Sequence, residues 1–274
     1  MTHVGAAVTP RSGQSWLDAI SEFEAATDRV MPVRRCYDGA PTTDIATSAA
    51  RWDLGVRRSV LSIKPTMSTP TTTLESLAAS IVAAGHDCDA IVYHEPVDNM
   101  SGADFIALYQ RTAAPLRAAG VSTGVCFTNW SCNLPYSDPQ SALAHYWPGD
   151  GVVDFLAIDE YPIGEIPAAG STSTKDAVPM DVRTRRVCQY ADARGIRLNL
   201  AEYGVDSAWD PAKSEKWLRS VTDWAKARAA AGTPLDWACY FSINTTGQFS
   251  YAVSNRAEFI DAYTDSYRIL DGGA

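Results

Sequence analysis

The stretch Ala90-Ile91-Val92-Tyr93-His94-Glu95-Pro96 decides how this sequence is interpreted. An apolar run of strand-forming residues ends abruptly in a histidine, a glutamate and a proline. A second stretch, Leu198-Asn199-Leu200-Ala201-Glu202-Tyr203-Gly204, has the same form. A carboxylate at the end of a buried strand is costly unless a partner or a reaction uses it. We therefore expect Glu95 and Glu202 to belong to one functional site.

Eight segments of the chain have the apolar character of buried strands, and each is followed by a helical pattern. Strands that are apolar on both faces are typical of a parallel sheet covered by helices. The expected strands are 3–8, 31–37, 58–64, 89–95, 122–128, 152–158, 196–202 and 235–242. The expected helices are 15–26, 44–54, 74–84, 101–119, 137–146, 176–194, 211–231 and 255–267.

This order of elements predicts an α/β fold, a (β/α)8 TIM barrel, with residues 1–274 forming a single catalytic domain. The length is suitable, because such barrels take about 250 residues. A doubly wound open sheet has the same local signals and is the second candidate. No G-x-G-x-x-G or P-loop follows the first strand, which disfavours the open sheet.

The charge of the chain limits the classes of partner. The formal net charge is −9, and no run of Lys or Arg exceeds two residues. A nucleic acid would require a positive field, so we expect no nucleic-acid partner. A neutral carbohydrate is not disfavoured by this charge.

The sequence contains no segment that resembles a membrane span or a signal peptide. No apolar run approaches the roughly 20 residues that a span requires. The first residues show no basic region followed by an apolar core. We expect a monomer or a domain of a larger chain, exported by another route or displayed at a surface, and the compartment stays open.

Six cysteines and four histidines bound the redox and metal chemistry. Most cysteines lie inside apolar patterns, where a free thiol acts as a small hydrophobic side chain. Cys126 and Cys132 could bridge a short loop, and this alternative stays open. No C-x-x-C pair occurs and no two histidines stand at i and i+4, so we expect no metal and no cofactor.

The residues at the strand ends carry the functional argument, because the chemistry of a (β/α)8 barrel lies at the carboxyl ends of its strands. Glu95 and Glu202 directly close the fourth and the seventh predicted strands, on nearly opposite sides of the barrel. The alternative is that each glutamate caps a helix or pairs with Arg35 or Lys64. The residues expected at this rim are Arg35, Tyr37, Lys64, His94, Glu95, Asn129, Trp130, Asp159, Tyr161, Glu202, Tyr203 and 241–244.

Two facing carboxyl groups are what the cleavage of a glycosidic bond requires. In a retaining enzyme they lie about 5–5.5 Å apart; one protonates the leaving oxygen and the other attacks the anomeric carbon. The acid must keep a raised pKa, and the nucleophile must stay ionised. We predict that Glu95 and Glu202 face each other across the mouth of the barrel as such a pair.

The chain also resembles a known family. The segment Tyr146–Tyr161 is similar to the stretch that runs into strand six of family 26 glycoside hydrolases, which belong to clan A of retaining (β/α)8 hydrolases. The acid/base glutamate of that family follows a histidine, as Glu95 follows His94. Its nucleophile stands in a Glu-aromatic-Gly motif, as in 202–204. The segment 127–131 resembles the Trp-containing end of its strand five.

This resemblance implies roles for individual residues. Glu202 would be the nucleophile, and Glu95 would be the acid and then the base. Tyr161 would hydrogen-bond Glu202, and His94 would contact the sugar beside the cleavage point. The further substrate-binding residues would be Trp130, as a stacking face, Arg35, near the nucleophile, and the strand-end residues Asn129 and Lys64.

The sequence departs from the family at two strand ends. Residues 96–99 replace a segment that is often rich in Trp and Gly, and residues 241–244 contain no Trp. These departures bear on the substrate more than on the chemistry. The family usually acts on β-1,4-mannan, so the prediction covers β-mannan and related β-linked polysaccharides or oligosaccharides.

Simpler interpretations exist for several of these residues. His94 could be a neutral histidine bonded to the backbone, and Tyr161 could serve packing alone. Trp130 is equally consistent with a sugar platform and a plain rim residue. Lys64 is more readily an ion-pair partner than the Schiff-base lysine of an aldolase. The second functional candidate is a non-catalytic carbohydrate-binding or structural module on a hydrolase-like barrel, part of a larger surface or tail assembly.

Overall fold

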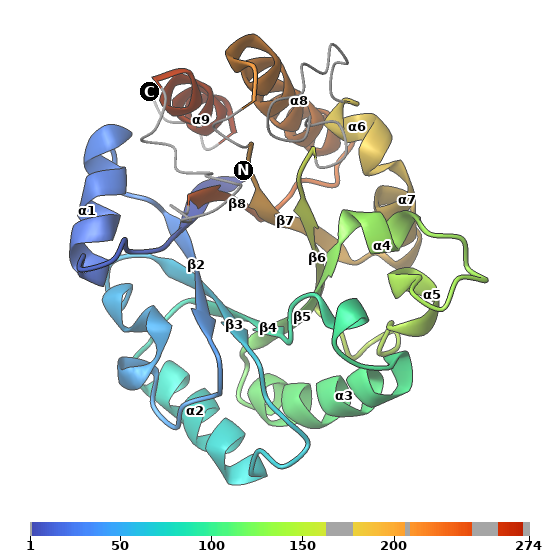
Figure 1. Ribbon diagram of the computed structural model, residues 1–274. Coiled ribbons are helices and arrows are strands. Elements are labelled where there is room, and N and C mark those ends of the chain that lie inside the picture. Colours follow the sequence, from blue (N-terminus) through green and yellow to red (C-terminus); the bar gives the residue numbers. More distant parts are fainter. Residues whose placement is uncertain (1, 163–177, 206–208, 243–256, 271–274) are drawn as a thin grey trace. The chain divides into compact units, whose positions relative to one another are not determined.

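The computed structural model describes residues 2–162, 178–205, 209–242 and 257–270 (Figure 1). Its eight strands form one closed parallel barrel in the order β1 to β8. The predicted (β/α)8 barrel is therefore confirmed, and the open doubly wound sheet is excluded. The strands are β1 (His3–Val8), β2 (Val33–Asp38), β3 (Arg58–Ile63), β4 (Cys88–Val92), β5 (Ser122–Thr128), β6 (Phe155–Glu160), β7 (Arg197–Tyr203) and β8 (Trp237–Ser242).

Helices connect the strands along the described chain, and none of those described is long and apolar enough to cross a membrane. The short 3-10 helices are η1 (Ile45–Thr47), η2 (Ala49–Trp52) and η3 (Pro96–Asp98). The α-helices are α1 (Trp16–Ala26), α2 (Thr71–Ala83), α3 (Gly102–Ala118), α4 (Asn129–Asn133), α5 (Ala142–His145), α6 (Met180–Arg183), α7 (Arg185–Arg194), α8 (Pro211–Ala230) and α9 (Ala257–Leu270).

Side-chain caps explain where the long helices begin. Ser15 accepts a hydrogen bond from Asp18 N at the start of α1. Asp210 does the same for Lys213 N at the start of α8, where Pro211 occupies the first helical position. Such caps satisfy backbone N–H groups that have no partner inside the helix.

The residues group into two compact units. The first unit comprises Met1–Pro32, Glu160–Arg185 and Leu200–Ala274. The second unit comprises Val33–Asp159 and Arg186–Asn199. In the first unit α8 packs on α9, and α9 packs on β1.

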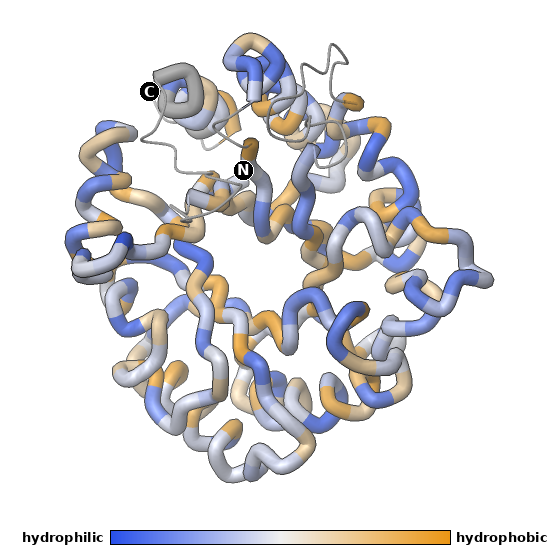
Figure 2. The backbone as a smooth tube through the Cα atoms, in the orientation of Figure 1, coloured by the Kyte–Doolittle hydropathy of each residue, from blue (hydrophilic) through white to orange (hydrophobic). Residues whose placement is uncertain are grey.

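In the second unit the outer faces of β2, β3 and β4 pack against α2. Leu61 and Ile63 of β3 join Leu74 and Leu77 of α2 in one fully buried cluster. In Figure 2 the helices α2 and α3 alternate between hydrophobic and hydrophilic residues, as expected of helices with one buried face. This packing fixes which residues of the strands point away from the helices.

On the inner face of the second unit, the side chain of one strand fills the space beside a glycine on the neighbouring strand. Gly124 of β5 pairs with Phe155 of β6. A Cβ atom on Gly124 would lie 2.2 Å from the Phe155 ring, so the ring occupies the space that a side chain would take. Glycine is therefore required at this position by packing inside the barrel.

Besides the helix expected at 137–146, of which only α5 forms, and the fourth strand, which ends at Val92, three elements differ from the sequence prediction. The helix expected at 44–54 is replaced by η1 and η2, because Ser48 between them is extended and caps η2 through Ala50 N. The helix expected at 176–194 is broken at Thr184, whose hydroxyl donates to Met180 O at 2.7 Å. Residues 176 and 177 lie outside the described residues.

The third difference is the sixth strand, which was expected at 152–158 and runs from Phe155 to Glu160. Asp154 ends the preceding turn because its carboxylate accepts hydrogen bonds from Thr123 N at 2.8 Å and from the Arg117 guanidinium. The shift carries two carboxylates, Asp159 and Glu160, into the strand itself.

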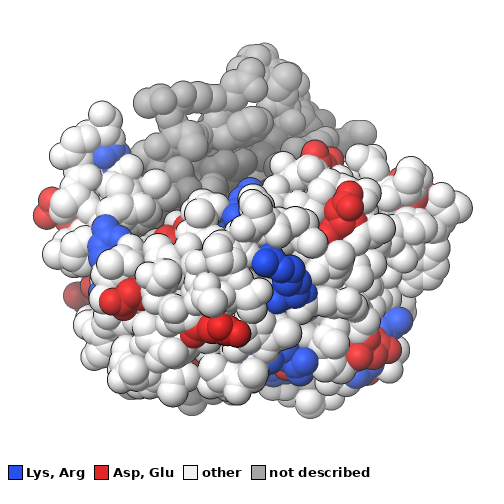
Figure 3. Space-filling view, turned by 90° about the horizontal axis from the view of Figure 1, so that it is seen from below, with Lys and Arg blue, Asp and Glu red and all other residues white. Residues whose placement is uncertain are grey.

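Charged side chains of both signs are interspersed on the face shown in Figure 3, with uncharged residues between them.

Candidate active site

Glu202 lies near the end of β7 in the first unit, and its orientation depends on an irregularity of that strand. Leu200 pairs with Ala238 of β8, but Tyr203 pairs with Tyr240, so β7 carries one extra residue. Such a bulge changes which residues share a face. Tyr203 packs edge-on against Tyr240, whose ring in turn contacts Tyr263 of α9. Glu202, as the neighbour of Tyr203 in the strand, points to the opposite, inner face.

The carboxylate of Glu202 has a specific partner. Tyr161, directly after β6, donates its hydroxyl to Glu202 Oε2 at 2.6 Å. Glu202 is only 8% exposed, so this charge-assisted bond forms in a largely water-free environment. The Tyr161 ring packs edge-on against Phe241 of β8, with centroids 5.8 Å apart. The Tyr161–Glu202 bond is the contact that the family resemblance implied.

A buried ion pair holds the chain beside Tyr161. Glu160, 2% exposed, pairs with the Arg183 guanidinium of α6. Arg183 Nη2 also donates to the carbonyl of Tyr161 at 3.0 Å. Arg183 thereby fixes the backbone that carries the Tyr161 ring.

In the second unit the chain after β4 adopts a strained conformation. The fourth strand was expected to reach Glu95 but ends at Val92. Tyr93 and Glu95 both have positive φ angles, 53° and 51°. A non-glycine residue in this region costs about 1–2 kcal/mol. Backbone strain of this kind is concentrated at functional sites, where the surrounding structure maintains it.

Two backbone bonds maintain the strained turn. Tyr93 N donates to Ile63 O of β3 at 2.8 Å, and Glu95 N donates to Cys126 O of β5 at 2.9 Å. The side chain of Asn99 donates to the Glu95 carbonyl at 2.9 Å. The half-buried Glu95 side chain is therefore carried by a backbone fixed between two neighbouring strands.

His94 lies between the two strained residues in an environment that keeps it neutral. Burial, with the charges of Arg35 and Lys64 adding to it, lowers the pKa of His94 to about 3. Its ring packs edge-on against Tyr37 at 5.5 Å, and its buried Nδ1 atom has no hydrogen-bond partner among the described residues. A neutral imidazole with an unused nitrogen is suited to bond a hydroxyl group of a ligand.

Arg35 points into the barrel and makes a buried ion pair across it. Its Nη1 atom donates to Asp159 Oδ1 of β6 at 2.7 Å. The Cys126 thiol donates to the other oxygen of Asp159 at 3.3 Å. Cys126 and Cys132 are both free thiols, so the open question of a disulfide between them is resolved against it.

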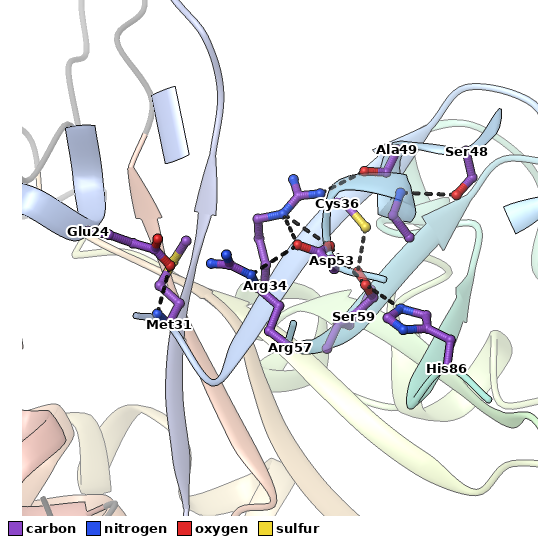
Figure 4. Close-up of polar contacts among 12 residues, drawn as sticks. Glu24, Met31, Arg34, Cys36, Ser48, Ala49, Asp53, Arg57, Ser59 and His86 are labelled. Atoms are coloured by element: carbon purple, nitrogen blue, oxygen red, sulfur yellow. Dashed lines mark hydrogen bonds and ion pairs between the residues drawn. The ribbon is translucent and has the colours of Figure 1, made fainter. Parts of the chain in front are cut away.

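Neighbouring arginines of β2 point to opposite faces. Arg34 points outward, where its Nε donates to both carboxylate oxygens of Asp53, at 2.8 and 3.1 Å (Figure 4). Asp53 also accepts from the Ser59 hydroxyl, which is bonded in turn to His86 Nε2. This second cluster lies on the helix side of the sheet and has a structural role.

The remaining predicted residues occupy different environments. The ammonium group of Lys64 lies 5.3 Å from the centroid of the Tyr93 ring, a cation–π contact. Asn129 and Trp130, expected at a strand end, form the first turn of α4, because the Thr128 hydroxyl caps Ser131 N. Asn129 is buried, whereas Trp130 is 57% exposed.

Two features of the described residues bear on other kinds of site. No group of three or more His, Cys, Asp or Glu side chains among them is arranged to hold a metal ion. A cavity of about 1010 Å³ in the second unit is lined by Arg117, Asp154 and Arg197 among others, at the amino ends of its strands. Barrel enzymes place their chemistry at the carboxyl ends, so we do not assign this cavity to catalysis.

Sequence reasoning missed three contributors to the site. Asp159 was placed at the rim without a partner, and the Glu160–Arg183 pair was not foreseen. The bulge in β7 leaves no sequence signature. A signal for Asp159 and Glu160 did exist, since two adjacent carboxylates closing an apolar strand require buried partners.

We expect the stability of the protein to fall as the pH decreases, partly because of His94. Its folded-state pKa of about 3 lies below the unfolded value of about 6.5, so the unfolded state binds a proton first. The stabilising contribution is present above pH 6.5 and is lost as the pH falls towards 3. Between pH 6 and pH 4, the unfolding free energy of the parent should fall by about 2 kcal/mol more than that of His94→Gln.

Urea unfolding at pH 7, 6, 5 and 4 measures this difference. His86, whose pKa burial also lowers, contributes equally to both proteins. The exposed His145→Gln variant is the control and should follow the parent. Parallel stability curves for His94→Gln and the parent would show that His94 is not held neutral.

The fold is shared with solved glycoside hydrolases. An endo-β-1,4-glucanase of Xanthomonas axonopodis pv. citri superposes with a TM-score of 0.65 at 12% identity, over 98% of this chain and 100% of that chain. An endo-β-1,3-glucanase of glycoside hydrolase family 128 from Amycolatopsis mediterranei, in complex with laminaripentaose, gives 0.59 at 14% identity, over 97% and 100%. A family 39 glycoside hydrolase from Bacteroides cellulosilyticus gives 0.61 at 9% identity, over 98% and 63%.

These similarities define a class of fold, the (β/α)8 barrel. No protein-family model and no curated protein sequence matches the chain. At identities of this size the likeness is one of architecture.

Proposed function

We propose that this protein is a retaining glycoside hydrolase that cleaves a β-linked glycan by double displacement. The observation that carries the proposal is Glu202, turned to the inner face by a bulge and bonded by Tyr161. The strained turn that presents Glu95 after β4 is its counterpart. Both strands end at the rim where (β/α)8 enzymes place their chemistry.

In the first step Glu202 attacks the anomeric carbon and forms a glycosyl ester. Glu95, protonated, donates its proton to the glycosidic oxygen, which leaves as an alcohol. In the second step Glu95, now ionised, takes a proton from water. The oxygen of that water attacks the anomeric carbon and releases Glu202. The mechanism requires the two carboxyl groups to lie about 5–5.5 Å apart.

The neighbouring residues fit this division of roles. The hydroxyl of Tyr161 stabilises the ionised form of Glu202 and fixes its orientation. His94 bonds a sugar hydroxyl through its unused Nδ1. Arg35 acts indirectly in this proposal, because its ion pair with Asp159 fills the barrel beneath the rim. Lys64 and Asn129 line the substrate path in this proposal.

The substrate class is a neutral β-glycan. Solved neighbours are named as β-1,4- and β-1,3-glucanases, and the sequence resembles family 26, which favours β-mannan. We propose that residues 1–274 act as one catalytic domain. The panel that tests the proposal contains β-1,4-mannan, cellulose oligosaccharides, β-1,3-glucan and mixed-linkage β-glucan, with the release of reducing ends as the readout.

A non-catalytic carbohydrate-binding module is the second candidate, favoured by the absence of Trp from residues 241–244. Residues 243 and 244 lie outside the described residues. Binding to one glycan of the panel with no cleavage of any would support this second candidate. Cleavage that releases a product with the anomeric configuration of the substrate supports the retaining hydrolase.

Tyr161→Phe should lower kcat on the cleaved glycan by about tenfold to a hundredfold, because a hydrogen bond to a charged group is lost. Initial rates of both proteins over a range of glycan concentrations measure the loss.

The control for Tyr161→Phe is Tyr109→Phe. This substitution removes a buried hydroxyl on α3 that is hydrogen-bonded to Thr123. Its kcat should match that of the parent. An unchanged kcat in Tyr161→Phe would contradict the assignment of Tyr161 as the partner of the nucleophile.

A further inference from the structure

Two aromatic side chains are exposed on the second unit, close together in the sequence. Trp130 on α4 is 57% exposed, and Tyr136 in the loop after α4 is 56% exposed. Every other Trp, Tyr and Phe whose burial the structure describes is buried or half-buried. In Figure 1 the segment that joins α4 to α5 projects outward beyond both helices. Large aromatic rings kept in water at two neighbouring places indicate a binding surface.

The Tyr136 ring has a cationic partner and stays more than half exposed. The Arg186 guanidinium of α7 lies 4.3 Å from the ring centroid, and Arg186 Nη1 donates to Asn133 O at 3.0 Å. His145 Nε2 pairs with the Tyr136 carbonyl at 3.1 Å. A cation–π contact covers one face of the ring and leaves the opposite face for a ligand.

The helix that carries Trp130 is short but well anchored. The Thr128 hydroxyl caps Ser131 N at 3.3 Å, and Asn133 Nδ2 donates to Asn129 O at 2.9 Å. Both aromatic residues therefore lie on backbone that is ordered before any ligand arrives. A preorganised surface loses little conformational entropy on binding.

The same surface adjoins the end of β4 within the second unit. Glu95 N is bonded to Cys126 O of β5, and β5 continues through Thr128 directly into α4. A polymer that reaches Glu95 therefore has α4 and the following loop as its immediate surroundings in this unit.

We propose that Trp130, Tyr136 and Arg186 form an accessory surface that binds a β-linked glycan chain beyond the point of cleavage. The inference rests on the proposed function, because it takes the substrate at Glu95 to be a glycan. The C–H groups on the face of a pyranose ring carry partial positive charge and are attracted to the negative face of an aromatic ring. The Arg186 guanidinium beside the Tyr136 ring is a polar group that can bond sugar hydroxyls.

A protein partner is the less favoured occupant of this surface. Protein-binding aromatic residues usually lie in a desolvated apolar centre that excludes water. Here the Tyr136 ring contacts the Arg186 guanidinium, and the backbone carbonyl of Tyr136 is bonded to the His145 imidazole. Aromatic rings that are exposed to water, carried on ordered backbone and placed beside polar groups favour a ligand rich in hydroxyl groups.

The test measures binding apart from cleavage. Each variant is made in the full chain with Glu202→Ala, and affinities for cellopentaose, laminaripentaose, mannopentaose and the matching polymers are measured by calorimetry and affinity electrophoresis. Tyr136→Ala should weaken polymer binding by about fivefold to tenfold, as should Trp130→Ala. Arg186→Gln should have a smaller effect. The loss should grow with the length of the glycan.

Met67→Ala is the matched control, since Met67 is equally exposed in the same unit at 57% and lies outside this surface. Circular dichroism confirms folding of each variant. If a glycan binds but Tyr136→Ala leaves its affinity unchanged, the accessory surface is overturned while cleavage by the parent still supports the hydrolase. If Tyr136→Ala abolishes only self-association or protein binding, the surface serves a protein. If the parent neither binds nor cleaves any glycan, both proposals fail.

Discussion

Glu202→Ala should lower kcat/KM by about 10⁴-fold or more on any β-glycan that the parent cleaves, because the covalent step loses its nucleophile. Tyr161 and the bulged strand hold this carboxylate in one orientation, so no neighbouring group replaces it. Substrate binding should remain, since the methyl group leaves the rest of the site in place. Initial rates and calorimetry on the same glycan separate the two effects.

Azide makes the Glu202→Ala experiment decisive for the mechanism. The small anion occupies the space of the missing carboxylate and attacks the anomeric carbon, which yields a glycosyl azide of inverted configuration. Activity should then recover in proportion to the azide concentration. The exposed Glu75→Ala variant on α2 serves as the control and should behave as the parent does. Undiminished cleavage by Glu202→Ala would refute the assignment of the nucleophile.

Glu95→Gln should lower kcat/KM by about 10²–10⁴-fold on an unactivated glycan, the usual contribution of a general acid. On an aryl glycoside with a good leaving group the loss in the first step should be much smaller, because no proton is needed there. The second step still lacks its base, so a glycosyl-enzyme should accumulate. Mass spectrometry of the intact protein detects the added mass on Glu202.

The pH profile supplies an independent readout for Glu95. In the parent, the fall in kcat/KM at high pH reports ionisation of the acid. This limb should be absent from Glu95→Gln. Asp98→Asn, an exposed carboxylate in η3, is the control and should keep the bell shape. An equal loss of activity on activated and unactivated substrates would argue against a role in proton transfer.

Much of the fold could be predicted because its signals are local. Apolar strands such as Ala90–Val92 and helices with one apolar face alternate along the chain, and only a few parallel topologies accommodate eight such repeats. Caps such as Ser15 and Asp210 are short-range features, because each lies next to the helix that it begins. Element ends were less predictable, since the end of β4 depends on bonds to β3 and β5 that are distant in sequence.

The candidate site likewise has features that the sequence predicts locally and features that depend on residues distant in the sequence. The glutamates, the histidine and Tyr161 could be named as candidates because polar residues closing apolar strands are conspicuous. Their environments were not predictable, because burial and charge come from other strands. The lowered pKa of His94, for example, arises from burial together with Arg35 and Lys64, which lie on β2 and after β3.

By itself the sequence determined the strand and helix order, the barrel class and the two glutamates at strand ends. The tertiary structure alone decided the direction of each side chain. Arg34 and Arg35 are chemically alike, yet one bonds Asp53 outside the sheet and the other Asp159 within it. One extra residue in β7 turns Glu202 away from the face that Leu200 occupies. The physical reason is that strand side chains alternate with a period of two, so a single inserted residue reverses a direction that no local pattern records.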